Sequence, residues 1–316
     1  METHQLAIVI PAYKAKYFRE TLESISQQTC KNFTLYIGDD HSPENIYPIV
    51  QQFENDINII YKRFDTNLGG SDLVAQWERC INLTQEEKWI WLFSDDDIME
   101  PQCVEDFFNE IKNVDLLYDV YHFNTKIISS NSQIIQESKK YPTLLSPYNF
   151  YKKKLYNNID SFVVEYIFSR ETYNKNNKFE HFDLAWGTDT ASWIKFANNL
   201  PIKTIENNSY ILWRSSEINI SPNKEKKVIN RKLKALSQFF EWTFQYFKNQ
   251  PHIKLHNYIF IISRLTQYSK YTDDQSIIYN FSTLIEKHYN KIWSSILFKT
   301  VFTIKRIKNI YVKKNI

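Results

Sequence analysis

The sequence predicts an α/β protein whose mainly parallel sheet is flanked by helices. In the first 100 residues, short apolar runs of strand length alternate with segments of helical periodicity. The apolar runs are continuous, as is typical of parallel strands covered on both faces. The chain of 316 residues is 43% hydrophobic and 24% charged, which is ordinary globular usage and excludes a disordered chain or a fibrous rod.

The elements of this first part follow from periodicity and breakers. Apolar runs predict strands over residues 6–10, 34–38, 57–61 and 89–93. Helical spacing predicts helices over 17–28, 46–53, 74–81 and 102–111, the last preceded by Pro101, a residue that favours the first position of a helix.

The middle of the chain, about 115–220, is less regular. Strands are expected within 116–123, 161–168 and 209–214, and a helix over 190–197. From about residue 224 the chain has no glycine, one proline and long aromatic-rich helical periodicity. We therefore expect an α/β domain over residues 1–222 and a helical C-terminal region over 223–316.

Charge and hydropathy narrow the class of protein. A formal net charge of +3 is too small for a nucleic-acid condenser, so no nucleic-acid partner is expected. No apolar run approaches the roughly 18–20 residues of a transmembrane helix. The N-terminal run LAIVI is too short for a signal peptide, and three cysteines without CxxC spacing suggest reduced thiols. These features favour a cytoplasmic protein.

Polar residues gather where the predicted strands end. In a parallel sheet these carboxyl ends share one edge, where ligands bind. Three of only four glycines fall there, and no GxGxxG or P-loop is present. The residues that follow the four strands are, in order, Pro11-Ala12-Tyr13; Gly38-Asp39-Asp40; Asn67-Leu68-Gly69-Gly70; and Asp95-Asp96-Asp97.

The run Asp95-Asp96-Asp97 predicts a divalent cation site. Three consecutive carboxylates repel one another unless a positive group neutralises them. Hard oxygen ligands suit Mg²⁺ or Mn²⁺, which bind through one or two carboxylates and substrate phosphates. The alternative is a solvated acidic turn that caps the helix beginning near Pro101.

These segments resemble the family-2 inverting glycosyltransferases of the GT-A fold, over roughly residues 4–220. The matching segments are IVIPAYK, YIGDDHS, NLGGSDLVAQWERC, LFSDDDIMEP and FDLAWGTDTASWIKFA. The chain departs from the family pattern at four places: His41 replaces a usual glycine, Ser94 an acid and Thr188 a glutamate, and Trp77-Glu78-Arg79 replaces the usual Ala-Arg-Asn end. The resemblance implies that Asp96 and Asp97 bind Mn²⁺ or Mg²⁺ and that the nucleotide sugar contacts Pro11, Ala12, Tyr13, Asp39, Asp40, Asn67, Gly69 and Asp95.

The resemblance also implies a catalytic base, for which we expect Asp189 in the segment WGTD. Asp183 in the same loop is the second candidate, and a first-turn acid of a helix is the structural alternative for Asp189. Trp186 and Trp193 are expected to offer apolar faces to a sugar ring. Arg214 is expected to reach the diphosphate as a forked donor, and the following SSEINISPN resembles the mobile closing segment of the family.

The C-terminal residues 290–316 contain seven Lys or Arg residues and no acid. Together with apolar bulk that includes Trp293, this pattern is typical of a helix that binds an anionic membrane surface. A helix packed on the protein with lysines extending to solvent is the alternative.

Taken together, we expect a metal-dependent inverting glycosyltransferase. It would move a sugar from a nucleotide donor, UDP by family habit, to a saccharide or lipid-linked saccharide in surface polysaccharide synthesis. A non-catalytic glycan-binding or scaffold protein of the same fold is the alternative. A glycoside hydrolase is disfavoured, because its paired acids line a sugar cleft and do not follow neighbouring strands as DDD and GDD do.

Overall fold

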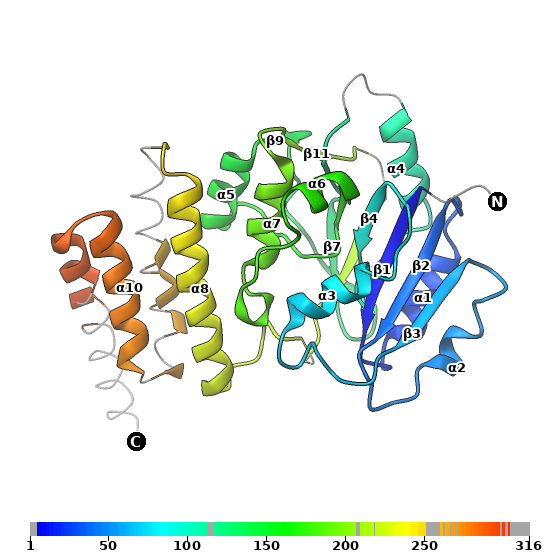
Figure 1. Ribbon diagram of the computed structural model, residues 1–316, viewed down its shortest axis with the longest axis horizontal. Helices are drawn as coiled ribbons and strands as arrows, with labels where there is room; N and C mark the ends of the chain where they lie inside the picture. Colours follow the sequence, from blue (N-terminus) through cyan, green and yellow to red (C-terminus); the bar gives the residue numbers. More distant parts are fainter. Residues whose placement is uncertain are drawn as a thin grey trace. The chain divides into compact units, whose positions relative to one another are not determined.

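The structure is a computed structural model. It describes residues 5–112, 117–206, 209–217, 219–250, 260–261, 263–265, 267–268, 271–272, 274–297, 299–300 and 303. The chain forms two compact units (Figure 1). The first contains Met1–His181 and Ser192–Ser216, and the second contains Phe182–Ala191 and Glu217–Ile316.

An eight-stranded mixed sheet forms the centre of the first unit, with helices against it (Figure 1). Its strand order is β3-β2-β1-β4-β10-β6-β11-β9. The predicted parallel strands are all present: β1 pairs in parallel with β2 and β4, and β2 with β3. The strands are β1 (Leu6–Ala12), β2 (Phe33–Asp39), β3 (Ile59–Arg63), β4 (Trp89–Leu92), β6 (Val120–His122), β9 (Leu144–Leu145), β10 (Tyr166–Ser169) and β11 (Ile202–Thr204).

A smaller sheet of order β5-β12-β7-β8 completes the first unit. Its strands are β5 (Ile98–Met99), β7 (Thr125–Ile128), β8 (Ile134–Glu137) and β12 (Ile211–Arg214). β5 follows the acidic run and pairs with β12, so this sheet connects the acidic loop to Arg214. The helices of the first unit are α1 (Phe18–Ser26), α2 (Tyr47–Val50), α3 (Leu73–Ile81), α4 (Cys103–Lys112), α5 (Pro147–Leu155) and α6 (Arg170–Lys175).

The central strands and their helices bury their apolar residues as the patterns predict. β1 is buried along almost its whole length, and α1 buries Phe18, Leu22 and Ile25 at helical spacing. α3 begins after Asp72, whose carboxylate accepts a hydrogen bond from the Ala75 backbone N–H as an N-cap. This packing fixes the carboxyl ends of β1, β2 and β4.

Several predicted elements are shorter than expected, among them the following helix and strand. The helix expected over 46–53 is reduced to α2, because the chain turns from residue 51 onward. The strand expected over 161–168 begins only at Tyr166. Just before this strand, the Val164 carbonyl accepts a hydrogen bond from the Trp91 indole at 2.7 Å. This carbonyl is therefore bonded to a side chain where a strand carbonyl would bond to the backbone of a neighbouring strand.

The described part of the second unit is helical, and this unit also contains Phe182–Ala191, which were expected in the α/β domain over residues 1–222. η1 (Asp183–Ala185) leads into α7 (Thr188–Ala197), a helix whose last residues belong to the first unit. α8 (Lys226–Tyr246) and α10 (Gln275–His288) lie side by side (Figure 1), with the rings of Phe240 and Phe281 in edge contact at 6.5 Å between centroids.

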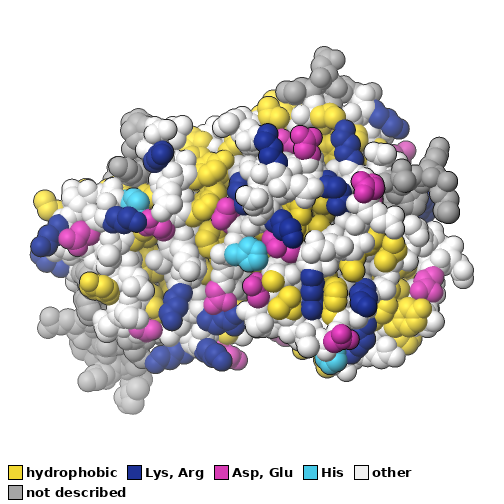
Figure 2. Space-filling view, viewed as in Figure 1, with side chains coloured by type: hydrophobic (Ala, Val, Ile, Leu, Met, Phe, Trp, Pro, Cys, Tyr) yellow, Lys and Arg dark blue, Asp and Glu magenta, His cyan; other side chains and the backbone are white. Residues whose placement is uncertain are grey.

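The C-terminal segment expected to contact a membrane is described only in part. Residues 304–316 lie outside the described residues. Among the helices that the structure does describe, none has the length and hydropathy to cross a bilayer. On the face shown in Figure 2, lysine and arginine side chains lie among aspartates and glutamates.

Candidate functional site

The first unit has a change of strand order at β1. The chain runs outward through β1, β2 and β3 and then returns to β4 on the other side of β1. In open α/β sheets, ligands bind at such a point, beyond the carboxyl ends of the strands. The residues that follow β1 and β4 here are Tyr13, Lys14 and the aspartates 95–97.

Asp95 connects these two strand ends. One oxygen of its buried carboxylate accepts hydrogen bonds from the backbone N–H groups of Tyr13 and Lys14, at 2.8 and 2.7 Å. Burial, and then the neighbouring charge of Asp96, raises the pKa of Asp95 to about 6. A cation bound beside it would favour the ionised carboxylate.

Asp96 is the acid of this run that faces a cation. Among the described residues, the charged group within ion-pair distance of its carboxylate is the ammonium of Lys14, at 3.7 Å. The Lys14 side chain is one-third exposed. The ion pair between Asp96 and Lys14 is therefore weak and screened by solvent, so a divalent cation could replace the ammonium at the Asp96 carboxylate.

Asp97 is turned toward the protein. One of its carboxylate oxygens accepts from the Ser94 hydroxyl and the other from the Arg214 backbone N–H, both at 2.6 Å. Burial and the charge of Asp96 raise the pKa of Asp97 well above its usual range. In the described part of the chain, no three acidic, histidine or cysteine side chains converge on one point as a preformed metal cage. A metal here would bind through one or two carboxylates and a substrate phosphate.

Asp39 holds the loop after β2. Its fully buried carboxylate accepts from the Ser42 backbone N–H at 2.7 Å, the Tyr61 hydroxyl at 2.5 Å and Arg63 at 2.7 Å. His41 comes directly before Ser42 in this loop, and its backbone has a positive φ of 56°. That left-handed conformation favours glycine, so the backbone keeps the form that the family's glycine suggests even though histidine stands here.

Asp40 holds the turn that follows β3. Its carboxylate accepts from the backbone N–H groups of Leu68 and Gly69 at 2.7 and 2.8 Å, and from the Arg79 guanidinium. A Cβ on Gly69 would lie 2.7 Å from an Asp40 oxygen, so only glycine allows this approach. Asn67 closes the same turn by accepting from the Gly70 N–H at 2.7 Å.

Arg214 is enclosed within the protein and is bonded to the acidic loop. Its fully buried guanidinium donates to the Asp96 carbonyl at 2.7 Å and to Glu20 at 2.8 Å, and stacks on Tyr17 at 4.2 Å. Its backbone N–H holds Asp97 as described above. A side chain so enclosed braces the acidic loop from within, so the expectation that it reaches the diphosphate is not supported by this geometry.

The first ten residues of the acceptor-side segment, Phe182–Ala191, belong to the second unit. Arg231 binds both oxygens of Asp183, at 2.9 and 2.6 Å, and this hydrogen bonding lowers the pKa of Asp183. Asp189 lies in the first turn of α7 and is half-buried. Among the described residues, its carboxylate accepts a side-chain hydrogen bond from the Thr190 hydroxyl, at 3.4 Å. Of the two candidate bases, Asp183 is engaged and Asp189 is available.

The two tryptophans near this segment differ. Trp193 is fully buried and stacks on Tyr166 at 4.8 Å, so the expectation that it offers a face to a sugar is wrong. The reason is that Trp193 lies on the part of α7 that belongs to the first unit, where its ring is part of the core. Trp186 is half-buried, and the ammonium of Lys232 lies 4.6 Å from its ring centroid.

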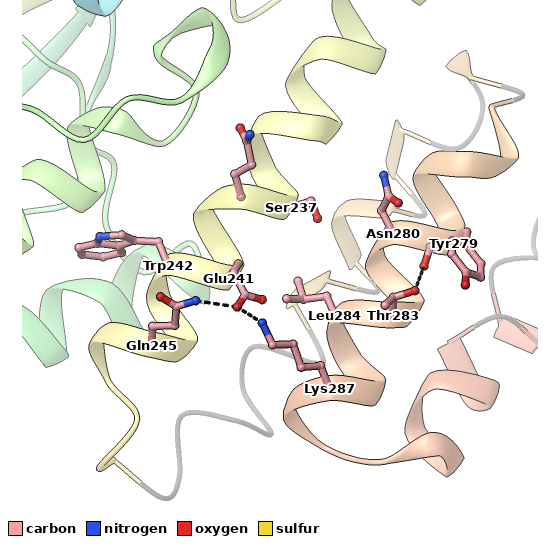
Figure 3. A pocket seen from close by; sticks show the side chains of 10 residues that line it. Ser237, Glu241, Trp242, Gln245, Tyr279, Asn280, Thr283, Leu284 and Lys287 are labelled. Atoms are coloured by element: carbon pink, nitrogen blue, oxygen red, sulfur yellow. Dashed lines mark hydrogen bonds and ion pairs between the residues drawn. The ribbon is translucent and has the colours of Figure 1, made fainter.

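A groove between α8 and α10 has a volume of about 530 Å³ (Figure 3). Its central carboxylate, Glu241, accepts from Lys287, His288 and Gln245 at 2.6, 2.9 and 2.7 Å. The rings of Trp242 and Tyr279 lie on the outer sides of their helices and do not face each other (Figure 3). Gln245 and Lys287 both donate to Glu241, and the lining includes no predicted site residue, so we do not assign the nucleotide to this groove. The lining residues are Ser237, Gln238, Glu241, Trp242, Gln245, Tyr279, Asn280, Thr283, Leu284 and Lys287.

Sequence reasoning missed three basic residues of these sites. Lys14 follows β1 directly, and its place at a strand end was a usable signal. Arg79 lies on α3, and its guanidinium donates a hydrogen bond to Asp40. Arg231 lies 48 positions from Asp183, and nothing in the local pattern links the two.

Comparison with known proteins identifies the class. The sequence profile described as glycosyl transferase family 2 matches residues 7–174, more than half of the chain. The chain therefore belongs to glycosyl transferase family 2. An uncharacterized glycosyltransferase of Methanocaldococcus jannaschii is 29% identical over 146 residues, which cover 44% of this chain and 48% of that protein. One of Haemophilus influenzae is 30% identical over 118 residues, 37% of this chain and 38% of that protein. The matches thus span less than half the length of either relative.

Solved structures show the same GT-A fold. S. aureus TarS 1–349 in complex with UDP-GlcNAc has a TM-score of 0.60 at 18% identity, covering 96% of this chain and 92% of that chain. The mannosyltransferase PcManGT from Pyrobaculum calidifontis, in complex with GDP-Man and Mn²⁺, has a TM-score of 0.55 at 11% identity, covering 98% and 88%. At these identities the likeness establishes the fold alone.

Proposed function

We propose that the protein is a metal-dependent inverting glycosyltransferase that uses a nucleotide-sugar donor, with UDP as the preferred nucleotide. The observation that carries the proposal is the arrangement at the switch point of a family 2 fold. There Asp95 binds the backbone of the loop after β1, and Asp96 faces the cation Lys14 beside it. The neighbours bound to UDP-GlcNAc and to GDP-Man with Mn²⁺ support a nucleotide-sugar ligand.

Asp96, with Asp95 beside it, would hold the divalent cation. When bound, Mn²⁺ or Mg²⁺ neutralises the negative charge that develops on the leaving diphosphate. The donor set fits, because hard cations prefer carboxylate oxygens and leave places for phosphate. Asp97 is omitted from the proposed ligands, because Ser94 and Arg214 occupy its oxygens.

The nucleotide would lie on the loops that the other aspartates hold in place. Pro11 and Ala12 end β1, and Tyr13 begins the loop that follows it. The Tyr13 side chain is 41% exposed, so its ring is available for a base. The carboxylates of Asp39 and Asp40 accept hydrogen bonds from their own loops. Each would contact the nucleoside only through an oxygen lone pair that these hydrogen bonds do not use. The ammonium of Lys14 lies beside the acidic loop and would donate a hydrogen bond to a phosphate oxygen of the donor.

Asp189 would accept the proton of the attacking hydroxyl. A sugar hydroxyl is too weak an acid to ionise alone, so a carboxylate must take its proton as the new bond forms. Asp189 carries no ion pair among the described residues, whereas Asp183 is bound by Arg231. The assignment rests on this difference and on the WGTD motif.

The acceptor is proposed to be a saccharide or lipid-linked saccharide of a surface polysaccharide. Contact of residues 290–316 with an anionic membrane remains part of this proposal and rests on the charge of that segment. Flotation of the full chain and of a chain ending at residue 289 with phosphatidylglycerol liposomes tests it. Equal flotation of both would remove the membrane contact.

A thermal-shift comparison tests the transferase against the binding-module alternative. UDP with Mn²⁺ should stabilise a transferase by mass action, by about 2.7 kcal/mol at a ligand concentration 100 times Kd. A glycan-binding module should respond to a saccharide without nucleotide. A chain that responds to a saccharide and ignores UDP with Mn²⁺ would contradict the proposed function.

A further inference from the structure

Lys232 on α8 is a fully buried lysine with an unusual set of partners. Its ammonium donates to the backbone carbonyls of Ile220, Ser221 and Asn223 at 2.6, 3.0 and 3.0 Å. Burial lowers the pKa of Lys232 to about 8, which leaves the ammonium mostly protonated at neutral pH. A buried charge is costly unless it is well bonded, and three carbonyls satisfy all three N–H groups.

The fourth partner of this ammonium is the ring of Trp186, whose centroid lies 4.6 Å away. Trp186 comes three residues before Asp189 in the chain, in the turn that leads into α7. A cation over an indole face is attracted by the ring and is more strongly held when water is excluded. Lys232 thus bonds two segments far apart in sequence, residues 220–223 and the turn at Trp186.

The turn that Lys232 contacts has a strained backbone. Leu184 and Ala185 have positive φ values of 57° and 52°, and Gly187 has 97°. Positive φ costs energy for residues other than glycine, and such residues collect at functional sites when the surroundings enforce them. The strain therefore requires contacts that hold the turn.

α8 supplies these contacts from one face. Arg231 binds both oxygens of Asp183. A Cβ on Gly187 would lie 3.1 Å from the Phe239 ring, so the turn packs closely on that ring. Phe239 also meets Phe182 edge-on at 6.0 Å. Lys232 is the contact that adds the segment 220–223 to this assembly.

Resting on the proposed function, we propose that Lys232 is a positioning residue for sugar transfer. It bonds the segment 220–223 to Trp186 and so fixes the strained turn that presents Asp189. It touches neither donor nor metal ligands in this account. Its loss should therefore lower turnover and leave nucleotide affinity unchanged.

The test compares Lys232→Met with wild type in the full-length protein. Methionine keeps the apolar stem and removes the ammonium. With Mn²⁺ and a panel of UDP-GlcNAc, UDP-glucose, UDP-galactose and GDP-mannose, turnover at saturating donor should fall by roughly 10- to 100-fold, since a misplacement of about 1 Å can cost 100-fold. UDP–Mn²⁺ affinity by calorimetry should stay within about twofold, because uniform binding is untouched. Tryptic cleavage after Lys224 should become faster.

The matched control is Lys234→Met on the same helix, where the side chain is exposed. It should keep wild-type turnover and wild-type cleavage after Lys224. Wild-type turnover by the Lys232→Met protein, with or without faster cleavage, would reduce Lys232 to a structural role and overturn the proposal. A wild-type protein that turns over no donor would instead overturn the proposed function, and this inference with it.

Lys232→Gln decides the matter if the methionine variant does not fold. Glutamine keeps two N–H donors for the carbonyls but carries no charge over Trp186. We expect unchanged UDP–Mn²⁺ affinity and turnover lowered by at least about twofold, the loss that the lower bound of a cation–π contact, roughly 0.5 kcal/mol, implies. Turnover equal to wild type would overturn the proposal.

Discussion

The guanidinium of Arg231 donates two parallel hydrogen bonds to the carboxylate of Asp183, of 2.9 and 2.6 Å. This forked pair ties α8 to the turn that precedes α7, within the helical unit. The pair also distinguishes Asp183 from Asp189, the second carboxylate of the acceptor-side segment. The ion pair holds Asp183 ionised and in place, and Asp189 keeps its oxygens available.

We expect the Asp183–Arg231 pair to stabilise the turn modestly. Both side chains are about one-third exposed, so the coupling energy in a double-mutant cycle of Asp183→Asn and Arg231→Met should be about 0.5–1 kcal/mol. Urea unfolding of the four proteins measures it. A coupling near zero would show that the pair does not hold the turn.

Two neighbouring aspartates should respond differently to alanine. Asp96→Ala should weaken Mn²⁺-dependent UDP binding by more than about tenfold, because the proposed metal loses a carboxylate ligand, a change of at least 1.4 kcal/mol. Asp97→Ala should instead destabilise the fold by about 1–3 kcal/mol, because the Arg214 N–H and Ser94 hydroxyl lose their acceptor. Calorimetry and urea unfolding of both variants separate the two effects. The reverse pattern would return Asp97 to the metal site.

Arg214→Met should act on stability. The guanidinium is buried and bonds the Asp96 carbonyl and Glu20, so its removal should cost about 2–4 kcal/mol, less than a fully buried pair because Glu20 regains water. UDP–Mn²⁺ affinity measured well below the melting temperature should stay within about threefold, or 0.6 kcal/mol. A stable variant that no longer binds UDP would support the diphosphate role instead.

Glu241 should make stability depend on pH in the acid range. Burial raises its pKa, but hydrogen bonds from Lys287, His288 and Gln245 outweigh burial and lower it to about 2. Its unfolded pKa is near 4.5, so the folded state binds the proton less readily. The contribution is therefore present above pH 4.5 and is lost as the pH falls toward 2. When the pH is lowered from 5 to 3, the free energy of unfolding measured in urea should fall by about 1 kcal/mol more for wild type than for Glu241→Gln. This figure is discounted because Glu241 is partly exposed to solvent. Parallel curves for both proteins would contradict this.

Local patterns were sufficient for the four parallel strands β1, β2, β3 and β4, but they did not predict β9 and β11 of the same sheet. Continuous apolar runs marked β1, β2 and β4 because parallel strands in the middle of a sheet are buried on both faces. The acids after those strands could be placed at one edge for the same reason.

The partners of the charged groups could not be read in this way. Arg214 ends β12, and only the pairing of β12 with β5 directs it back under the acidic loop. Trp193 follows a motif that suggests sugar binding, yet its position on α7 places it in the core. Such long-range contacts depend on how elements pack, which local periodicity does not encode.

The central claim is that Asp189 is the general base of a nucleotide-sugar transferase. The direct test is the turnover of Asp189→Asn at saturating donor with Mn²⁺, beside Asp183→Asn as the matched control. Asparagine keeps the shape but cannot take the proton, so turnover should fall by about 10²- to 10⁴-fold with donor affinity nearly unchanged. Asp183→Asn should lose far less. An Asp189→Asn protein that keeps more than half of wild-type turnover would contradict the account.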